Sequence, residues 1–390
     1  MKCIVAITAI AALVAGACDK NINVKDQSDI NTINACSKYN ADITIDGVKG
    51  ITALSLDSVK QVSGQLVIQN MYDLQTVSLG QLTYAKSLKI VNNTNVYKVD
   101  IPLLSQIDSD FQVIVNPNLK NLQYTNITKV SNFQIIDTFV DNLGVFAASK
   151  VGSIEVLSNP QLKTLDFSSV QSTSGYINIA NNAKDSNVTF SSLTQVGGNI
   201  SFGNTGALSI DKLNSVGDDF SLYTNSFPNL TVSSLQAAKK SITLSGNKFK
   251  TITFPKLTEV GSSLNINNNT NFRSIGASTF PQLTSIPGGI ILEGNFDNIT
   301  FPKLKSVDGA VTLKGKGKLT CNTFSTNLSA ASNIDCSMTN DSTEESTDSS
   351  SKGSSSSGSG SSSKKPSSGA SHTTVAAVLG GFAALVAACL

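Results

Sequence analysis

Histidine, tryptophan and charged residues are scarce in this chain of 390 residues. It contains one histidine and no tryptophan, and charged residues make up 14% of it, against about 25% in an average soluble protein. The formal net charge is +2, and Arg273 is the only arginine. A surface that binds nucleic acid needs clustered basic residues. The composition therefore predicts no nucleic-acid partner.

A short apolar run stands near the beginning of the chain. Lys2 precedes the apolar segment 4–14, and the small residues 15–17 come next. A basic start, a short apolar core and small residues at a cleavage site are typical of a secretory signal peptide. We predict a signal peptide at 1–17, cut after its last residue. A bacterial lipoprotein signal, with Cys18 as the first mature residue, is the rival interpretation, and the C-terminal sequence argues against it.

The composition changes abruptly after Cys336. Residues 337–371 are nearly all Ser, Thr, Gly, Lys and acidic residues, a composition that cannot bury enough apolar surface to fold. The chain then ends in the apolar segment 375–390. A polar spacer followed by an apolar C-terminal tail is typical of a glycosylphosphatidylinositol (GPI) attachment signal. We predict a disordered stalk at 337–369 and a GPI propeptide at 370–390.

A membrane-spanning tail anchor is the alternative interpretation of the apolar tail. The tail is slightly short for that role, is rich in Ala and Gly, and has no basic flank. The GPI signal is therefore favoured. The attachment residue, called ω, must be small and must be followed by small residues. The ω candidates are Gly369, which we prefer, Ser368, Ser367 and Ser361.

A unit of about 22 residues recurs through the middle of the chain. Residues 254–269, Phe-Pro-Lys-Leu-Thr-Glu-Val-Gly-Ser-Ser-Leu-Asn-Ile-Asn-Asn-Asn, show its features: an apolar residue, another three places on, a short corner, an alternating strand and an Asn. A period of this length is typical of solenoids. Twelve copies align on Val59, Leu82, Leu104, Ile127, Ala148, Val170, Leu193, Leu213, Leu235, Leu257, Leu283 and Leu304.

The strand after each corner alternates apolar and polar residues, as in 242–245 (Ile-Thr-Leu-Ser) and 264–267 (Leu-Asn-Ile-Asn). This alternation indicates one buried face. A second short strand follows in most copies, and no copy has a helical apolar pattern. We therefore predict an all-β fold at 41–318: a right-handed parallel β-helix, or receptor-L-domain-like solenoid, of about twelve rungs. Caps at 18–40 and 319–336 would cover its two open ends.

An Asn stands at the end of the strand in many copies. Asn tolerates the left-handed backbone of a sharp corner, and its amide can bond neighbouring backbone groups. Stacked from rung to rung, such residues would form a ladder. The set is Asn70, Asn92, Asn204, Asn225, Asn247, Asn268 and Asn295.

Six cysteines are present, and four would remain in the mature protein. Cys3 lies in the signal peptide and Cys389 in the C-terminal propeptide. The other four form two local pairs, Cys18 with Cys36 and Cys321 with Cys336. Because secretion permits disulfides, we predict one disulfide in each cap. Metal binding is the weaker alternative, since the chain has no C-x-x-C pattern and no usable histidine.

Glycans would supply the solubility that the sparse charges do not. Acceptor sequons for N-glycosylation are frequent, and we expect modification at those on outward corners. They stand at Asn92, Asn126, Asn187, Asn199, Asn229, Asn268, Asn298, Asn327 and Asn340.

The ordered combination of these features resembles a known fungal family. Signal peptide, paired cysteines, repeats, Ser-rich stalk and GPI signal together are similar to the GPI-anchored glycoproteins of cell-wall organisation and spore-wall assembly, which carry receptor-L-domain-like repeats. The most telling local motifs are 116–122 (Asn-Pro-Asn-Leu-Lys-Asn-Leu), 159–165 (Asn-Pro-Gln-Leu-Lys-Thr-Leu) and the Phe-Pro-x-Leu corners. The resemblance covers essentially the whole chain.

The resemblance implies a location on the outer leaflet of the plasma membrane, through the GPI lipid, or in the wall. It implies a role in wall integrity and no catalytic residues or cofactors. The implied partners are wall polysaccharide, such as β-glucan, or wall mannoproteins. The pair Lys364-Lys365, just before the preferred ω residue, is similar to the dibasic signal associated in fungi with retention at the membrane. A solvated basic pair is the equally weighted alternative.

A wall glycosidase or transglycosidase is one alternative function. His372 lies beyond the preferred ω residue, so Ser-His or Cys-His catalysis is excluded. Four acids are candidates for a carboxylate pair, which needs a separation of roughly 5–9.5 Å. Asp110 and Asp219 share a repeat position but lie five rungs, or about 24 Å, apart. Asp218 and Asp219 should point to different sides, and turn chemistry explains these three, and Asp108, better.

A carbohydrate-binding or host-binding adhesin is the other alternative. Outward strand positions are mostly Thr, Ser, Asn, Gln and Lys, with Tyr176 and Tyr223 among them. Exposed aromatic residues on consecutive rungs would favour binding. We predict a GPI-anchored surface glycoprotein required for fungal wall organisation and integrity, with a structural, non-catalytic role.

Overall fold

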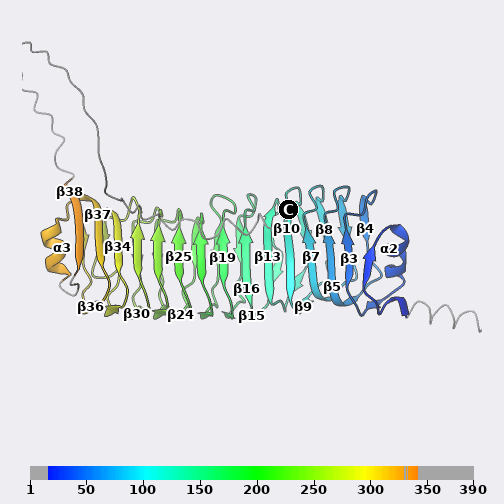
Figure 1. Ribbon diagram of the computed structural model, residues 1–390, viewed down its shortest axis with the longest axis horizontal. Coiled ribbons are helices and arrows are strands. Elements are labelled where there is room, and N and C mark those ends of the chain that lie inside the picture. Colours follow the sequence, from blue (N-terminus) through cyan, green and yellow to red (C-terminus); the bar gives the residue numbers. More distant parts are fainter. Residues whose placement is uncertain (1–15, 329–330, 332, 341–390) are drawn as a thin grey trace, which may run out of the picture. The chain divides into compact units, whose positions relative to one another are not determined.

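The computed structural model describes residues 16–328, 331 and 333–340 (Figure 1). The first fifteen residues of the predicted signal peptide and everything after residue 340, including the predicted GPI propeptide and its ω candidates, lie outside the described residues. The side chains of Asn327 and Asn340 also lie outside them.

The described chain coils into a parallel β-solenoid, as predicted. Long strands follow one another across the view in Figure 1, each paired in parallel with the strand of the next turn. They belong to a 17-stranded sheet, and the part of it outside β2, β9 and the first residues of β5 and β7 is here called the main face. The strands of this sheet are β1 (Ile22–Val24), β2 (Lys38–Tyr39), β3 (Ile43–Asp46), β5 (Gln61–Gln69), β7 (Tyr84–Val91), β9 (Gln106–Ile107), β10 (Asp110–Asn116), β13 (Asn132–Thr138), β16 (Ser153–Leu157), β19 (Ile177–Ala180), β22 (Ile200–Gly203), β25 (Phe220–Tyr223), β28 (Ile242–Ser245), β31 (Leu264–Asn267), β34 (Ile290–Asn295), β37 (Val311–Gly317) and β38 (Ile334–Asn340).

An eight-stranded sheet of two-residue strands runs along the lower edge of the view in Figure 1. Together with β2, β9 and the first residues of β5 and β7, which occupy the same position in earlier turns, it is called the second face. Its eight strands are β15 (Lys150–Val151), β18 (Ser172–Thr173), β21 (Gln195–Val196), β24 (Ser215–Val216), β27 (Ala237–Ala238), β30 (Glu259–Val260), β33 (Ser285–Ile286) and β36 (Ser306–Val307).

Short sheets of three-residue or two-residue strands form the third face. The turn from Ile200 to Asp219 shows the order: β22 on the main face, β23 on the third, then β24 on the second. The third-face strands are β4 (Ala53–Ser55), β6 (Thr76–Ser78), β8 (Lys98–Asp100), β11 (Asn121–Gln123), β17 (Thr164–Asp166), β20 (Asn187–Thr189), β23 (Ala207–Ser209), β26 (Asn229–Thr231), β29 (Thr251–Thr253), β32 (Ser274–Ile275) and β35 (Asn298–Ile299). The pair β12 (Asn126–Ile127) and β14 (Val145–Phe146) forms a small separate sheet.

The solenoid has about fourteen turns rather than the predicted twelve. The extra turns lie at the ends, where the repeat is least regular. At the N-terminal end, β1 lies within the predicted cap and pairs with β3. At the C-terminal end, β38 continues to Asn340 and pairs with β37. Residues 337–340, which we had assigned to the stalk, therefore belong to the folded solenoid.

The inward side chains form rows that continue from turn to turn. On the main face, Leu66, Leu88, Phe111 and Phe133 pair in register and are fully buried. Aromatic rings stack along the core, as in Phe254 and Phe280, whose centroids are 5.3 Å apart. The alternation read from the sequence thus becomes one continuous apolar core.

The long main-face strands from β3 to β31 have a left-handed residue at or next to their last residue. Nine residues other than glycine have φ between 54° and 59° there: Asn70, Asn92, Val115, Asp137, Ser158, Asn181, Asn204, Thr224 and Asn268. Glycine occupies the same position at Gly47 and Gly246. Asn and Gly are the residues that adopt this conformation most readily.

A buried asparagine ladder follows one residue later. The Asn247 side-chain oxygen accepts a hydrogen bond from the backbone N–H of Asn225 at 3.0 Å, and its amide donates to the backbone carbonyl of Leu222 at 2.9 Å. The same two contacts recur at several turns, through Asn93, Asn159, Asn225 and Asn269. Our predicted set therefore mixed different positions. Asn70, Asn92, Asn204 and Asn268 are corner residues, whereas Asn225 and Asn247 belong to the ladder. Asn295 has neither role and lies within β34, where it pairs with Lys316.

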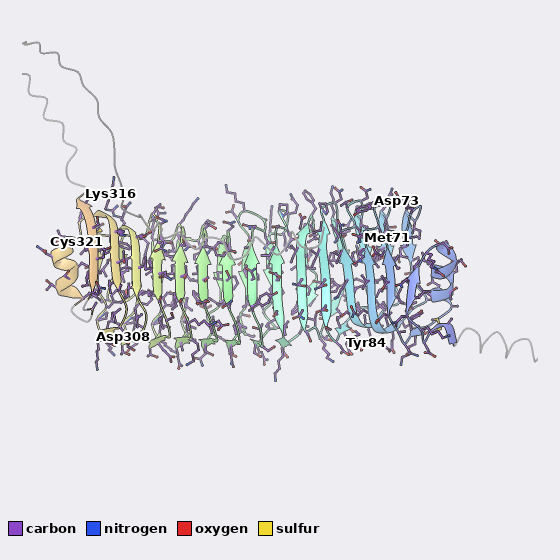
Figure 2. All side chains as sticks on the ribbon, in the orientation of Figure 1. Met71, Asp73, Tyr84, Asp308, Lys316 and Cys321 are labelled. Atoms are coloured by element: carbon purple, nitrogen blue, oxygen red, sulfur yellow. A yellow bond between two sulfur atoms is a disulfide. The ribbon has the colours of Figure 1, made fainter. Side chains whose placement is uncertain are left out.

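A disulfide closes each end, as predicted for the caps, and a helix lies beside each disulfide. Helix α2 (Gln27–Asn34) buries Ile30 and Ile33, and Cys18 bonds Cys36. The N-cap of this helix is Asp26, which accepts from the N–H of Ser28. Helix α3 (Cys321–Asn327) buries Phe324, and Cys321, labelled in Figure 2, bonds Cys336. Neither described helix is long and apolar enough to cross a membrane.

Candidate functional site

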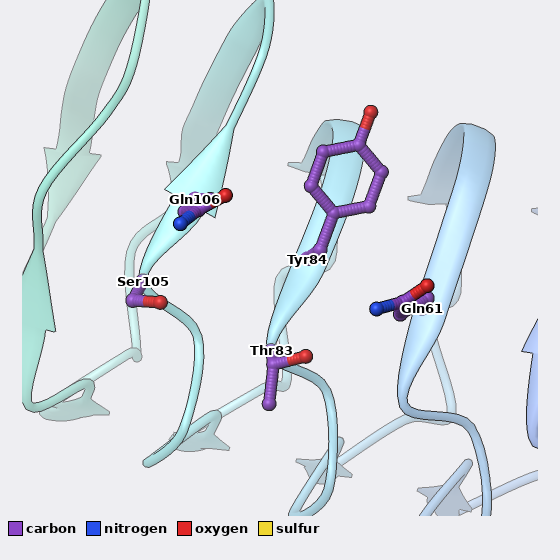
Figure 3. Close-up of a pocket in the computed structure, with 5 residues that line it drawn as sticks. All are labelled: Gln61, Thr83, Tyr84, Ser105 and Gln106. Atoms are coloured by element: carbon purple, nitrogen blue, oxygen red, sulfur yellow. The ribbon is translucent and has the colours of Figure 1, made fainter.

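A shallow polar groove opens on the second face near the N-terminal end of the solenoid (Figure 3). Its volume is about 350 Å³. Five side chains from three consecutive turns line it: Gln61, Thr83, Tyr84, Ser105 and Gln106. This set of residues is called the second-face groove below.

The repeat itself builds the groove. Buried Val59, Leu82 and Leu104 anchor the three turns, and the lining residues follow one or two positions later. Gln61, Tyr84 and Gln106 pair in register across neighbouring strands. Val62, Ala85 and Ile107 directly follow these three residues and are buried, so Gln61, Tyr84 and Gln106 point outward. Thr83 and Ser105 stand at the corner just before the strands.

Asp108 holds the hydroxyl of Tyr84. The hydroxyl donates to Asp108 Oδ2 at 2.6 Å, and Lys129 Nζ forms an ion pair with Asp108 Oδ1 at 2.6 Å. Lys129, and then Tyr84, lower the pKa of Asp108 below its usual range. The same contact with Asp108 raises the pKa of Tyr84. The tyrosine is therefore neutral near pH 7 with its proton committed to the carboxylate.

The lining of the second-face groove carries no formal charge. Its polar groups are two amides and three hydroxyls, which can donate and accept hydrogen bonds but cannot neutralise an ion. Charged residues lie beside it. Lys38 and Lys129 follow the same row, through backbone pairing with Gln61 and Gln106. Lys60 precedes Gln61 in the chain, and Asp108 accepts from the hydroxyl of Tyr84. The chemistry of the groove suits a neutral, polyhydroxylated ligand. Within the described part of the chain, no cluster of His, Cys, Asp or Glu could hold a metal ion.

The four acids considered for catalysis are engaged in structural contacts. Asp110 accepts from Asn132 at 2.9 Å and lies 3.4 Å from Lys89. Asp219 accepts from the N–H of Ser241 at 2.8 Å. Asp218 contacts Lys240 at 2.7 Å, and Asp108 has the contacts given above.

Asp110 and Asp219 occupy the same register position, as expected. Pairing of Phe111, Phe133, Ile154, Ile177, Ile200 and Phe220 places them five turns apart, which is about 24 Å. The pKa values of Asp108 and Asp110 are lowered. A general acid for glycoside cleavage needs a shift in the opposite direction.

Exposed aromatic residues do not form a strip on consecutive turns in the described part of the chain. Tyr72, Tyr97, Phe139 and Tyr176 are exposed, and only Tyr72 and Phe139 share a repeat position, three turns apart. Burial and Glu155, which accepts from its hydroxyl at 3.2 Å, raise the pKa of Tyr176 to about 12. The ring of Tyr223 covers Gly203, where a Cβ would lie 2.1 Å from it.

The predicted glycosylation sites lie on different faces. Asn187, Asn229 and Asn298 are exposed and each begins a third-face strand. Asn92 and Asn268 are left-handed corner residues. Asn199 is half-buried and accepts from the N–H of Asp219, and the Asn126 side-chain oxygen is buried.

The residues of the second-face groove were not among those predicted to form a site. The signal was present in the repeat alignment, because Gln61, Tyr84 and Gln106 each stand two places after an aligned apolar residue. The alignment therefore predicts a row of outward side chains at that position. That their surface is hollowed depends on the side chains of neighbouring turns.

Comparison with known proteins identifies fungal relatives. The chain is 25% identical over 327 residues to the protein ecm33 of Aspergillus fumigatus, covering 83% of this chain and 80% of the relative. It is 26% identical over 302 residues to a cell surface GPI-anchored protein of Arthroderma benhamiae, covering 76% of each. The chain is a homologue of these fungal proteins.

A third relative is the cell wall protein ecm33 of Schizosaccharomyces pombe, 28% identical over 245 residues, which are 62% of this chain and 52% of the relative. These matches confirm the family resemblance given by the repeats, the cysteine pairs and the termini. No protein-family model matches the chain. No solved structure matches it either.

Proposed function

We propose that this homologue is a GPI-anchored protein of the fungal cell surface that supports cell-wall organisation without catalysing a reaction. The observation that carries the proposal is the similarity, over 76% of the chain, to a relative named a cell surface GPI-anchored protein. The wall protein of Schizosaccharomyces pombe adds the link to the wall. A capped solenoid suits this role because it presents long, regular faces to extended partners.

The anchor is tested on intact cells by treatment with a phosphatidylinositol-specific phospholipase. We expect release of the protein with its C-terminus at one of the ω candidates, Gly369 first. A variant with the segment 375–390 deleted serves as control and should be secreted without treatment. Retention after phospholipase treatment, with the apolar tail still attached, would show a membrane-spanning tail instead.

The role in the wall is tested by deleting the gene and growing the cells with wall-perturbing dyes. We expect increased sensitivity and an altered outer mannoprotein layer, both restored by the intact gene. Unchanged wall composition and dye resistance in the deletion strain would contradict the proposal.

The non-catalytic role is supported by the contacts of the four acids and by the lowered pKa values of Asp108 and Asp110. Incubation of the purified ectodomain with laminarin-type oligosaccharides tests it directly. We expect neither hydrolysis nor transfer. New oligosaccharide products, lost in Asp110→Asn, would identify a wall glycosidase.

A further inference from the structure

We propose that the second-face groove binds a neutral, extended, β-linked glucose chain. The inference deepens the proposed function by naming the class of ligand for one surface, and it rests on that function only for the presence of glucan at the cell surface. Three features of the described residues carry it: a positioned aromatic ring, amides on both sides of it, and an uncharged window of defined length.

The aromatic ring is that of Tyr84. Figure 3 shows it standing out from β7, with Gln61 on the strand to one side and Gln106 on the strand to the other. Its hydroxyl is held by Asp108. The apolar C–H face of a sugar ring packs against an aromatic ring, and a tyrosine with few free rotations loses little entropy when it binds. Tyr84 therefore offers a platform for one sugar.

The two glutamines supply the polar contacts. Each amide donates and accepts hydrogen bonds, and the exposed hydroxyl groups of a sugar do the same. Thr83 and Ser105 form a second polar row below them (Figure 3). Glucose in a β-linked chain has equatorial hydroxyls around a flat apolar face, which fits a platform edged by amides. A sugar with an axial hydroxyl on that face fits less well.

The spacing of the rungs sets the length of the ligand. Successive parallel strands lie about 4.8 Å apart, so Gln61 and Gln106, two rungs apart, span about 10 Å. An extended β-linked glucan advances by about the spacing of one rung for each sugar, so the three lining rungs correspond to three sugars. Lys38 and Lys129 bound the window at its two ends. The uncharged window therefore accommodates about three sugars along the solenoid axis.

The groove is also free of the predicted glycans. None of the sequon asparagines lines it, and the exposed sites Asn187, Asn229 and Asn298 belong to the third face. A glucan ligand can therefore approach the second-face groove without displacing the N-linked glycans of the protein.

The test is a calorimetric titration of the purified, glycosylated ectodomain. The ligands are β-1,3-glucan and β-1,4-glucan oligosaccharides of two to six sugars. We expect affinity to rise up to about three sugars and then level off. Tyr84→Ala and Gln106→Ala should each weaken binding by about tenfold, the loss expected when an aromatic platform or an amide contact is removed. Tyr84→Phe, which keeps the ring, should retain most of the affinity.

Two matched variants serve as controls. Tyr176→Ala removes an exposed tyrosine of the main face, and Gln195→Ala removes an outward amide further along the second face, so both should bind like wild type. An α-mannan oligosaccharide is the comparison ligand and should bind more weakly.

Three outcomes would overturn the assignment. They are an absence of binding by any β-glucan oligosaccharide at millimolar concentration, equal loss in Tyr176→Ala, and preference for mannan. Because each variant's fold is checked by circular dichroism and the anchor and dye-sensitivity tests are run on cells, failure here is distinguishable from failure of the proposed function.

Discussion

Val115 and Thr224 are the two β-branched residues among the nine non-glycine left-handed corner residues. The φ of Val115 is 55°, and the left-handed conformation costs an ordinary residue about 1–2 kcal/mol. Asn occupies the same position in five turns. Such corners show that a single residue per turn decides where the strand ends and the chain bends.

We expect Val115→Asn to raise the free energy of unfolding by about 1 kcal/mol, because Asn adopts positive φ more readily than Val. The substitution creates no sequon. Ile114→Asn, at the preceding residue with ordinary φ, should not stabilise the protein. Denaturant melts of the two variants measure the difference, and a destabilised Val115→Asn would contradict the account.

Substitution in the buried asparagine ladder should destabilise the protein, in contrast to Val115→Asn. In Asn247→Ala, the N–H of Asn225 and the carbonyl of Leu222 lose their partners inside the solenoid. Unsatisfied buried groups cost about 1–3 kcal/mol each, so we expect a loss of about 3 kcal/mol in thermal or denaturant melts. Asn121→Ala, at an exposed asparagine of β11, is the matched control and should change stability little. Equal effects would show that the ladder is not stabilising.

At the scale of the elements, the caps protect turns that have only one neighbour. Stability in a solenoid depends on contacts between adjacent turns, so the last turns are the first to open. The disulfide Cys321–Cys336 closes a loop of 15 residues over β37 and β38.

Replacing both cysteines, Cys321→Ser with Cys336→Ser, should destabilise this end by about 3 kcal/mol. Hydrogen exchange is the appropriate measurement because a long solenoid need not unfold in one step. We expect faster exchange in β37 and β38 and unchanged exchange in β19 and β22. Uniformly faster exchange along the whole solenoid would contradict a local role for the cap.

An ion pair ties the same end together and depends on pH. Arg273 contacts Asp297 at 2.8 Å, and Asp297 also accepts from the N–H of Lys318. The contact with Arg273 lowers the pKa of Asp297 from 3.8 to about 2. The stabilisation is therefore complete above about pH 4 and is lost as pH falls through about 2.

The matching variant is Asp297→Asn. Its melting temperature should lie below that of wild type at pH 7, and the difference should shrink as pH falls from 3.8 to about 2. Because the side chains of Asp297 and Arg273 remain partly exposed to solvent, at 30% and 40%, we expect a modest difference. A difference that grows on acidification would have the wrong sign for a lowered pKa.

At the scale of the whole molecule, the three faces differ in what they present. The third face carries three exposed sequons, the main face carries long strands of polar side chains, and the second face carries the groove. A protein with few charges can remain soluble when glycans cover part of its surface.

We predict glycans at Asn187, Asn229 and Asn298, because their side chains are exposed, and none at Asn126, whose side-chain oxygen is buried. Mass spectrometry after enzymatic deglycosylation in heavy-oxygen water measures the occupancy of each site. Single replacements by Gln should each remove one glycan at the first three positions and leave the mass of the glycoprotein unchanged at Asn126. A glycan at Asn126, with the three third-face sites unmodified, would contradict the prediction that exposed side chains determine which sites are glycosylated.

The sequence by itself determined the architecture. Alternating strands at a period near 22 residues can bury their apolar sides only by stacking, and two local cysteine pairs lie where the stack would otherwise be open. These are local patterns, repeated often enough to outweigh the ambiguity of any one copy. The end turns escaped because β1 and β38 lack the full pattern.

Only the tertiary structure decided which asparagines turn the chain and which form the ladder, since the two positions are adjacent and share a residue type. It also decided that Gln61, Tyr84 and Gln106 surround a groove. A cavity depends on how side chains from three turns fill space together, and their spacing along the chain does not contain that information. Repetition fixes the backbone, whereas the surface follows from contacts between residues more than twenty positions apart.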